Sequence, residues 1–308
     1  MSSEEIFDLI IVGGGAAGLT AGIYSSRAHL STLILNEGAI GGQMVLTDEI
    51  ANYPGVEKTN GYLLASIMKN QAKQFGCKIK SNLKIQAYFL EEKIKRVVLE
   101  DGREFRSRSV ILSPGGRPRP LQIPGEEQYK GSGISYCATC DGEFFTGKEL
   151  IVVGGGNSAL EEAVALTTYA KKVTIVHQFD HFQAFQHAVN QAKMNPKIEF
   201  IMESELRSFH GNSVLQEVSM EHLPSGLITT KKIDGVFIFA GYIPNTADLE
   251  KTIALNQRKE IIVDSDMKTN IPGVFAAGDC IAKKYRQVTT AVADGTIASL
   301  SAAEHLRS

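Results

Sequence analysis

The stretch FDLIIVGGGAAG, from Phe7 to Gly18, decides the fold of this chain, and a close copy, KELIVVGGGNSA, runs from Lys148 to Ala159. In each copy a continuous apolar run predicts a buried parallel strand, the glycines predict a tight turn, and the residues after them predict the start of a helix. A second apolar run follows each predicted helix, at Thr32 to Glu37 and at Val173 to Gln178. The repeated order of strand, helix and strand predicts an α/β protein with two dinucleotide-binding units.

Two joints rich in glycine and proline divide the chain: SPGGRPRPLQIPGEE, which begins at Ser113, and GYIPNT, which begins at Gly241. Proline restricts its own backbone and that of the residue before it, so few core contacts cross such joints. The second unit is expected to close with one strand over KKIDGVFIFAG, Lys231 to Gly241, and the chain then completes the first unit, with a helix from about Gln287. The sequence therefore predicts two Rossmann-like domains, the second (119–243) inserted into the first (1–118 and 244–308).

Composition and charge restrict the class of partner. A chain of 308 residues with 43% hydrophobic content buries a large core, and its formal net charge of -2 gives no whole-chain reason to expect nucleic acid or an acidic membrane surface. The acidic N-terminus lacks the pattern of a signal peptide, and no apolar run approaches the roughly 18 residues that span a bilayer. Four cysteines with a single close pair do not form a secreted disulfide framework. We expect a cytoplasmic protein with neither nucleic-acid nor membrane partners.

The first glycine set, Gly13, Gly15 and Gly18, has the spacing of a nucleotide-binding turn. The first glycine permits the tight turn, the second lets backbone approach a pyrophosphate, and the third lets helix and strand pack closely. Glu37 closes the second predicted strand about twenty residues later, where a carboxylate binds ribose hydroxyls. Together these features predict that the first unit binds a nucleotide.

The pair CATC, Cys137 to Cys140, is followed directly by Asp141. Two residues between cysteines allow a small disulfide ring that opens and closes with little backbone movement. The alternative, half of a zinc site, lacks a second CxxC and any His or Cys at finger spacing, so we expect no metal. Asp141 is interpreted as the acid that moves a proton to a leaving thiolate rather than as a solvated loop carboxylate. Cys77 and Cys280, which have no close cysteine in sequence, are interpreted as small buried hydrophobic residues.

The combination of these motifs resembles the low-molecular-weight thioredoxin reductases, and the resemblance runs essentially end to end. Its further marks are GAIGGQ (Gly38 to Gln43), NYPG (Asn52 to Gly55), AAGDC (Ala276 to Cys280) and YRQVTTAVADG (Tyr285 to Gly295). The resemblance implies a homodimeric FAD enzyme in which Cys140 takes electrons from the flavin, Cys137 attacks the substrate disulfide and Asp141 donates a proton. It also implies rotation of the inserted domain, for which the two joints are candidate hinges.

The same resemblance implies which residues hold FAD, in the first and last thirds of the chain. By position these are Gly13, Gly15, Ala16 and Gly18 at the pyrophosphate, Glu37 at the ribose, Gly42, Gln43 and Asn52 near the isoalloxazine, and Asp279, Gln287 and Val288 where the flavin site closes.

The stretch VHQFDHFQAF, Val176 to Phe185, bears on the electron donor. Family members that use NADPH carry a His-Arg-Arg run here and another arginine four residues later, whereas this chain has Gln178, Phe179 and Gln183. A 2′-phosphate needs charge-assisted donors, such as the planar fork of arginine, so the sequence disfavours NADPH. At least one phenylalanine of the stretch is interpreted as filling adenosine space, and the others as core packing.

NADH stays open as a donor because the second glycine turn, Gly154, Gly156 and Ala159, is intact. Against it, His177 and Gln178 stand where NAD sites place an acid for the ribose. Ferredoxin-dependent flavin thioredoxin reductases lack the residues that bind the nicotinamide nucleotide, and this chain resembles them more than it resembles the NADPH-dependent members. The favoured interpretation is therefore a second turn that has lost its nucleotide, with reduced ferredoxin as donor.

The function expected from the sequence is transfer of electrons from reduced ferredoxin through FAD to the Cys137/Cys140 disulfide, and on to thioredoxin or a similar protein disulfide. An acidic ferredoxin requires a basic surface, and Lys171, Lys172, Lys231 and Lys232 are candidates for part of it. Two alternatives stay open: an NADH-dependent or, less favoured, NADPH-dependent thioredoxin reductase, and a non-enzymatic redox sensor that contains flavin and a dithiol.

Overall fold

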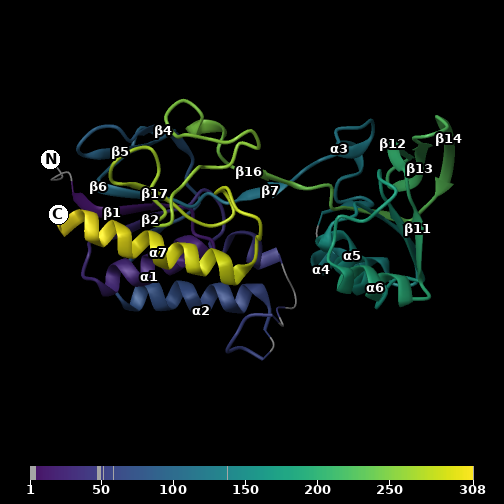
Figure 1. Ribbon diagram of the computed structural model, residues 1–308, viewed down its shortest axis with the longest axis horizontal. Helices are drawn as coiled ribbons and strands as arrows, with labels where there is room; N and C mark the ends of the chain where they lie inside the picture. Colours follow the sequence, from purple (N-terminus) through teal and green to yellow (C-terminus); the bar gives the residue numbers. More distant parts are fainter. Residues whose placement is uncertain (1–4, 47–49, 51, 58, 137, 308) are drawn as a thin grey trace. The chain divides into compact units, whose positions relative to one another are not determined.

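The structure, a computed structural model, describes residues 5–307 apart from 47–49, 51, 58 and 137, and it divides into two compact units. The first unit consists of residues 1–117 with 243–308, and the second of residues 118–242. Figure 1 traces both units along the chain, with the first unit at the purple and yellow ends of the colour scale. The sequence-based boundaries, 118/119 and 243/244, differ from this division by one residue at each joint.

The first unit is built on a seven-stranded sheet with the strand of the first glycine motif at its centre. Strand β1 (Ile6–Val12) pairs in parallel with β2 (Thr32–Leu35) and with β6 (Glu104–Leu112). The described strands follow the order β3, β2, β1, β6, β5, β4, and β17 also pairs with β6. Both faces of β1 are buried, which explains its continuous apolar run. The other strands are β3 (Lys78–Lys80), β4 (Ile85–Phe89), β5 (Lys95–Leu99) and β17 (Val274–Ala276).

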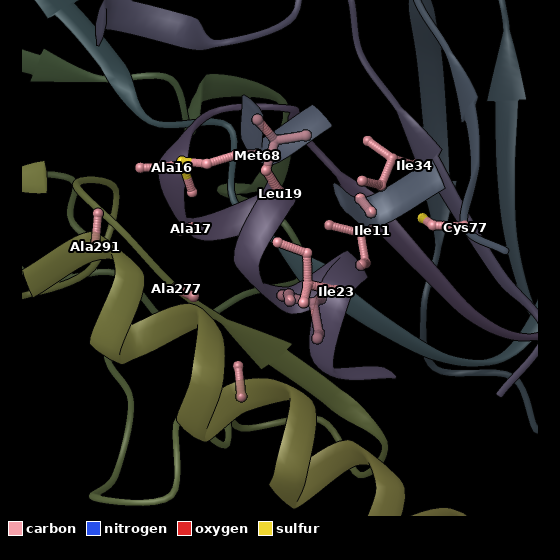
Figure 2. Close-up of a cluster of buried hydrophobic side chains, with 14 of the residues drawn as sticks. Ile11, Ala16, Ala17, Leu19, Ile23, Ile34, Met68, Cys77, Ala277 and Ala291 are labelled. Carbon is pink, nitrogen blue, oxygen red and sulfur yellow. The ribbon is translucent and has the colours of Figure 1, made fainter. Parts of the chain in front are cut away.

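Three long helices supply apolar side chains that pack against one face of this sheet. Figure 2 shows Leu19 and Ile23 of the first helix with Ile11 and Ile34 of the sheet, in one buried cluster. Ala291, from the last helix, belongs to the same cluster, which ties the C-terminal part of the chain to the glycine turn. The helices are α1 (Ala16–Arg27), α2 (Gly61–Gln74) and α7 (Val288–Arg307), with short 3-10 helices η1 (Gly42–Leu46) and η3 (Ala247–Leu249).

The second unit repeats the parallel arrangement in a five-stranded sheet of order β11, β10, β9, β15, β8, beside an antiparallel sheet of β12, β13 and β14. The parallel strands are β8 (Ile134–Ser135), β9 (Glu149–Val153), β10 (Lys172–Val176), β11 (Ile198–Ile201) and β15 (Gly235–Ile238). The antiparallel strands are β12 (Ser204–Gly211), β13 (Leu215–His222) and β14 (Leu227–Lys232). The helices are α3 (Glu126–Tyr129), α4 (Ala138–Asp141), η2 (Gly142–Phe145), α5 (Asn157–Leu166) and α6 (Gln186–Met194). The predicted α/β fold with two dinucleotide-binding units is confirmed.

The stretch KKIDGVFIFAG was expected to form one strand, and that expectation is wrong. Its lysines end the mostly exposed strand β14, whereas its apolar residues form β15, which is fully buried in the parallel sheet. Asp234 separates the two, and its Oδ2 accepts the Glu149 backbone N–H at 2.8 Å. Charged and apolar halves need opposite environments, so the chain changes sheets between them. It leaves the unit through β16 (Tyr242–Pro244), which pairs with β7 (Gly116–Pro118).

Candidate functional site

The first glycine turn connects β1 to α1, and the packing of the chain itself requires two of its glycines. Gly13 has φ +102°, and a Cβ there would lie 2.1 Å from the carbonyl oxygen of Ser113. A Cβ at Gly18 would lie 1.9 Å from the Gly13 carbonyl oxygen. These approaches match the tight turn and the close packing of helix and strand that the glycine spacing indicates.

Gly15 differs, because the described chain leaves the space beside it open. A Cβ at this position would come within 4 Å of one described atom, Gly42 Cα, at 3.9 Å. The loop before Gly42 is fixed by the Gly41 N–H, which donates to the Gly14 carbonyl at 2.8 Å. Helix α1 begins at Ala16 with no side-chain cap and no acid in its first turn, so its N–H groups and positive dipole end are available to an anion. A pyrophosphate fits this cradle.

Glu37 follows β2 and is held in an exposed position. Its Oε1 accepts the Ile85 backbone N–H at 3.1 Å. Its neighbour Asn36, which the sequence analysis missed, ties the glycine turn to this loop. Asn36 Oδ1 accepts the Gly14 N–H at 2.8 Å, and Asn36 Nδ2 donates to the Gly38 carbonyl at 2.6 Å. The sequence signal was an amide, which both donates and accepts, directly before the acid that is predicted to bind the ribose.

Asn52 and Gln287 are 235 residues apart in sequence, and the structure brings their side chains together. Asn52 Nδ2 donates to Gln287 Oε1 at 3.3 Å. Both residues are exposed, as is Gln43 in η1. Val288 begins α7 directly after Gln287, so the last helix of the unit starts beside Asn52. The roles of these residues near an isoalloxazine stay predictions.

Asp279 lies on the loop between β17 and α7 and carries a buried acceptor. Its Oδ1 atom has no hydrogen-bond partner among the described residues, although Lys283 Nζ lies 3.3 Å away as an ion pair. Burial raises the pKa of the Asp279 carboxyl, and the charge of Lys283 opposes that rise. A buried acceptor that receives no hydrogen bond costs free energy. The site therefore suits a hydroxyl-bearing ligand such as FAD.

The redox pair follows β8 in the second unit. Cys140 lies in α4, whereas Cys137 falls outside the described residues. Asp141 ends α4, and its Oδ2 accepts the hydroxyl of Ser135 at 2.6 Å. Because β8 is parallel to β15 and β15 to β9, α4 and the second glycine turn both follow the carboxyl edge of one sheet. Ligands of doubly wound sheets bind at this edge.

The two other cysteines are confirmed as buried residues. Cys77 and Cys280 expose 4% and 0% of their surface. Burial raises the pKa of Cys77 to about 11 and that of Cys280 to about 12. Thiols with such pKa values carry almost no thiolate near neutral pH, so neither is suited to disulfide exchange.

The second glycine turn keeps the backbone form of the first. Gly154 has φ +134°, and a Cβ there would lie 2.5 Å from the Phe239 carbonyl oxygen and 3.0 Å from Ala159 Cβ. At Gly156, by contrast, no described atom lies within 4 Å of the Cβ position. Helix α5 starts directly afterwards without a side-chain cap. The turn thus retains the shape that admits a phosphate.

The segment after β10 folds back onto this second turn. His177 is 5% exposed, and its ring lies 2.4 Å from the Cβ position of Gly155. The ring stacks on Phe182, with centroids 5.9 Å apart. Gln183 donates its backbone N–H to the Gly155 carbonyl at 2.8 Å. Burial lowers the pKa of His177, so the imidazole brings no positive charge to the turn at neutral pH.

The outer face of this segment is aromatic and acidic. Phe179 and Phe185 are 37% and 54% exposed, whereas Phe182 packs against the core of the unit. Asp180 Oδ1 lies 2.6 Å from His181 Nδ1. This contact is a hydrogen bond when the histidine is neutral and an ion pair when it is protonated. No lysine or arginine occurs from residue 173 to residue 192. The segment therefore lacks the fixed positive charge that a 2′-phosphate needs.

Three of the four lysines considered for an acidic partner form a hydrogen bond or an ion pair within the unit. Lys171 lies 3.3 Å from a Glu149 oxygen, and Lys172 lies 2.6 Å from a Glu199 oxygen. Lys231 donates to the Thr174 hydroxyl at 3.0 Å. Lys171 and Lys232 also line a hollow of about 640 Å³. Lys171 and Lys172 stand where β10 begins, at the edge opposite α4, so these lysines add little support for docking beside the cysteine pair.

Within the described residues, no helix is long and apolar enough to cross a bilayer. Nor does that part of the chain gather three or more His, Cys, Asp or Glu side chains in a position to bind a metal ion.

Comparison with known proteins places these sites in context. Residues 7–295 match the family described as pyridine nucleotide-disulphide oxidoreductase. A thioredoxin reductase from Peptoclostridium acidaminophilum is 41% identical over 310 residues, which cover 98% of each chain. The crystal structure of Lactococcus lactis thioredoxin reductase has a TM-score of 0.92 at 38% identity and covers 98% of this chain and 99% of that one. A ferredoxin-flavin thioredoxin reductase from Clostridium acetobutylicum is more distant, with 26% identity and a TM-score of 0.53 over 98% of each chain.

Proposed function

Since this chain belongs to the pyridine nucleotide-disulphide oxidoreductase family, we propose that it is a flavoenzyme of thioredoxin-reductase type that takes electrons from reduced ferredoxin and reduces the disulfide of a thioredoxin-like protein. It is an oxidoreductase, and FAD is its cofactor. The family assignment leaves no support for the non-enzymatic sensor. The donor and the disulfide partner are the parts that we propose.

The first unit offers FAD a cradle at Gly15 and, at Asp279 Oδ1, a buried acceptor that receives no hydrogen bond from the described residues. When bound, FAD supplies the ability to accept electrons from one donor and to pass two of them to a disulfide. We assign the pyrophosphate to the N-terminus of α1, the ribose to Glu37 and the flavin end to the Asn52 and Gln287 pair.

The cysteines perform the exchange that follows. The Cys137 thiolate attacks one sulfur of the partner disulfide, which forms a mixed disulfide and releases the other partner sulfur as a thiolate. The Cys140 thiolate then attacks the Cys137 sulfur, which releases the second partner thiolate and closes the Cys137–Cys140 disulfide. Two electrons thus pass from the pair to the partner. Asp141, held by Ser135, supplies a proton to a departing thiolate.

The single observation that supports a donor other than NADPH is the uncharged segment on the second glycine turn. The buried His177 ring and the Gln183 backbone contact Gly155, and no cation stands near in sequence. Each charge-assisted hydrogen bond contributes about 1.5 to 3 kcal/mol, so the loss of two or three weakens NADPH binding on the order of a thousandfold or more. Reduced ferredoxin has no 2′-phosphate and does not need these hydrogen bonds.

NADH is a second candidate donor, favoured by one observation. The space beside Gly156 is open, and α5 starts there without a cap, as α1 does after Gly15. NADH lacks the 2′-phosphate and therefore loses nothing from the missing arginines. Asp180, 75% exposed in its side chain, is the nearest acid for ribose hydroxyls, although it comes three residues after His177.

We also propose a homodimer. Helices α1 and α2 of the first unit expose Tyr24, Tyr62 and Ile67 by 39%, 68% and 61%, and α7 exposes Leu300 by 55%. Exposed apolar side chains on neighbouring helices are typical of a surface covered in an assembly. Sedimentation or light scattering should give twice the mass of 33.4 kDa plus FAD, and a monomer at micromolar concentration would contradict this assignment.

The exchange path is tested with serine variants of the pair, loaded with FAD and supplied with reduced ferredoxin and oxidised thioredoxin. Cys137→Ser should lose thioredoxin reduction while its flavin is still bleached by the donor. Cys140→Ser should block passage from the flavin to Cys137, so that no mixed disulfide is resolved. Retention of more than a few per cent of wild-type turnover in Cys137→Ser would refute the assigned path.

A further inference from the structure

The ammonium group of Lys283 lies between two carboxylates in the first unit. Its Nζ is 2.7 Å from Asp294 Oδ2 and 3.3 Å from Asp279 Oδ1. The side chains of Lys283 and Asp294 are each 13% exposed, and that of Asp279 is 27% exposed. Lys283 lies four residues after Asp279 and eleven residues before Asp294, and this spacing did not predict the cluster. Its members join the loop after β17 to helix α7.

Asp294 is the fixed end of the cluster. It projects from α7, and its Oδ2 accepts both the Lys283 ammonium and the Gly278 backbone N–H, the latter at 3.2 Å. Lys283 Nζ also lies 3.4 Å from the Thr290 hydroxyl, again on α7. Hydrogen bonds therefore anchor Lys283 to the helix, and its ammonium forms an ion pair with Asp279 Oδ1 at 3.3 Å.

A second cation, Arg286, also lies close to Asp279. Arg286 forms an ion pair with the buried Glu260, and its Nε donates to the Asp279 backbone carbonyl at 3.2 Å. Both cations favour the ionised form of the Asp279 carboxylate, and Lys283 Nζ forms an ion pair with its Oδ1 at 3.3 Å. Without Lys283, the buried Asp294 and the partly buried Asp279 would lose the cation between them, and an uncompensated charge is destabilising in a protein interior.

We propose that Lys283 is a positioning residue of the flavin site: its ammonium holds the Asp279 carboxylate by an ion pair, and the buried Oδ1, which receives no hydrogen bond from the described residues, is left to accept one from a cofactor hydroxyl. The proposal rests on the assignment of Asp279 to the FAD site. Asp294 has the complementary role, because it binds Lys283 by hydrogen bond and holds it at α7. A ligand that donates to Oδ1 then completes the cluster.

The test measures FAD binding to the apoprotein by quenching of flavin fluorescence, together with the melting temperature of each apoprotein. Lys283→Met should weaken FAD binding by about tenfold to a hundredfold, the effect of one lost interaction with a charged group. The wild-type cluster has two carboxylates and one ammonium, with a net charge of about -1. The double variant Lys283→Met with Asp294→Asn keeps one carboxylate and therefore has the same net charge. This double variant should therefore recover much of the lost affinity, which a purely packing role of Lys283 would not allow.

Controls separate failure of this inference from failure of the flavin-site assignment. If Asp279→Asn binds FAD like the wild type, the assignment of Asp279 is wrong. If Asp279→Asn weakens binding but Lys283→Met does not, the role of Lys283 is overturned. Strictly additive losses in the Lys283 and Asp294 variants would overturn it as well. Should Lys283→Met fail to fold, Lys283→Gln takes its place, because glutamine keeps a donor to Asp294 while removing the charge.

Discussion

The hydroxyl of Ser135 donates to Asp141 Oδ2 at 2.6 Å, and this contact spans the redox motif from the strand before it to the end of helix α4. Ser135 is 4% exposed, so its hydroxyl has a fixed environment. The hydrogen bond fixes the orientation of one carboxylate oxygen of the residue that we propose as the proton donor. The position of the acid therefore depends on a residue outside CATCD.

Ser135→Ala should slow thioredoxin reduction about tenfold, because a hydrogen bond to a charged group contributes about 1.5 to 3 kcal/mol and part of that is lost in positioning. Reduction of the flavin by its donor should be unchanged. Steady-state turnover of Asp141→Asn and of the double variant completes the cycle. If the two single losses simply multiplied in the double variant, Ser135 would not act through Asp141.

Gly15 and Gly18 should respond differently to a side chain. The open space beside Gly15 tolerates a Cβ in the apoprotein, so Gly15→Val should keep its melting temperature as apoprotein and purify without flavin. Gly18→Ala is the matched contrast, because its Cβ would lie 1.9 Å from the Gly13 carbonyl oxygen and should destabilise the fold itself. Absorbance near the flavin band and thermal melts distinguish the two. Full flavin content in Gly15→Val would show that this turn is not the FAD cradle.

How much the sequence predicted depended on the range of the interactions. The glycine turns followed from local spacing, because the steric needs of Gly13 and Gly18 arise within one strand, turn and helix. The contact of Asn52 with Gln287 spans 235 residues and was not predicted, because the family resemblance implied only that each of the two residues belongs to the flavin site.

Other parts of the site were beyond sequence reasoning. The Lys283 cluster was missed because charged residues on an irregular loop have no period that predicts their partners. The KKIDGVFIFAG stretch predicts one strand because β14 ends at Lys232, β15 begins at Gly235, and neither glycine nor proline stands between them. The lysines proposed for docking were selected by charge alone. The fold pairs Lys171 with Glu149 and Lys172 with Glu199, which the sequence did not predict.

Glu162 on α5 predicts a pH-dependent stability. Burial, with a smaller effect of Glu161, raises the pKa of this carboxyl from 4.5 to about 7. The folded chain thus holds a proton between these pH values that the unfolded chain has released, so stability present below pH 4.5 is lost as the pH rises to 7. The loss is at most about 3 kcal/mol.

Glu162→Gln removes this titration. Relative to the wild type, the variant should gain stability between pH 4.5 and pH 8, as measured by urea unfolding at both values. Glu127→Gln, at a side chain 89% exposed, is the control and should follow the wild type at both pH values. An equal stability difference between Glu162→Gln and wild type at the two pH values would contradict the prediction.

Restoring positive charge to the segment on the second glycine turn should restore NADPH binding. The triple variant Gln178→Arg, Phe179→Arg and Gln183→Arg places guanidinium groups where the resemblance locates the 2′-phosphate. NADPH affinity should rise on the order of a thousandfold, whereas NADH affinity should change little because NADH lacks that phosphate. Calorimetric titration of both nucleotides provides the comparison. Equal gains for NADPH and NADH would indicate a general charge effect instead.

The central claim, that electrons do not come from NADPH, is tested most directly by anaerobic titration of the FAD-loaded protein. NADPH, NADH and chemically reduced ferredoxin are added separately, while flavin bleaching and then thioredoxin thiol formation are recorded. The account predicts that ferredoxin bleaches the flavin and that micromolar NADPH leaves it yellow. Bleaching by NADH but not by ferredoxin would replace the proposed donor with the second candidate, and rapid, saturable bleaching by micromolar NADPH would contradict the account.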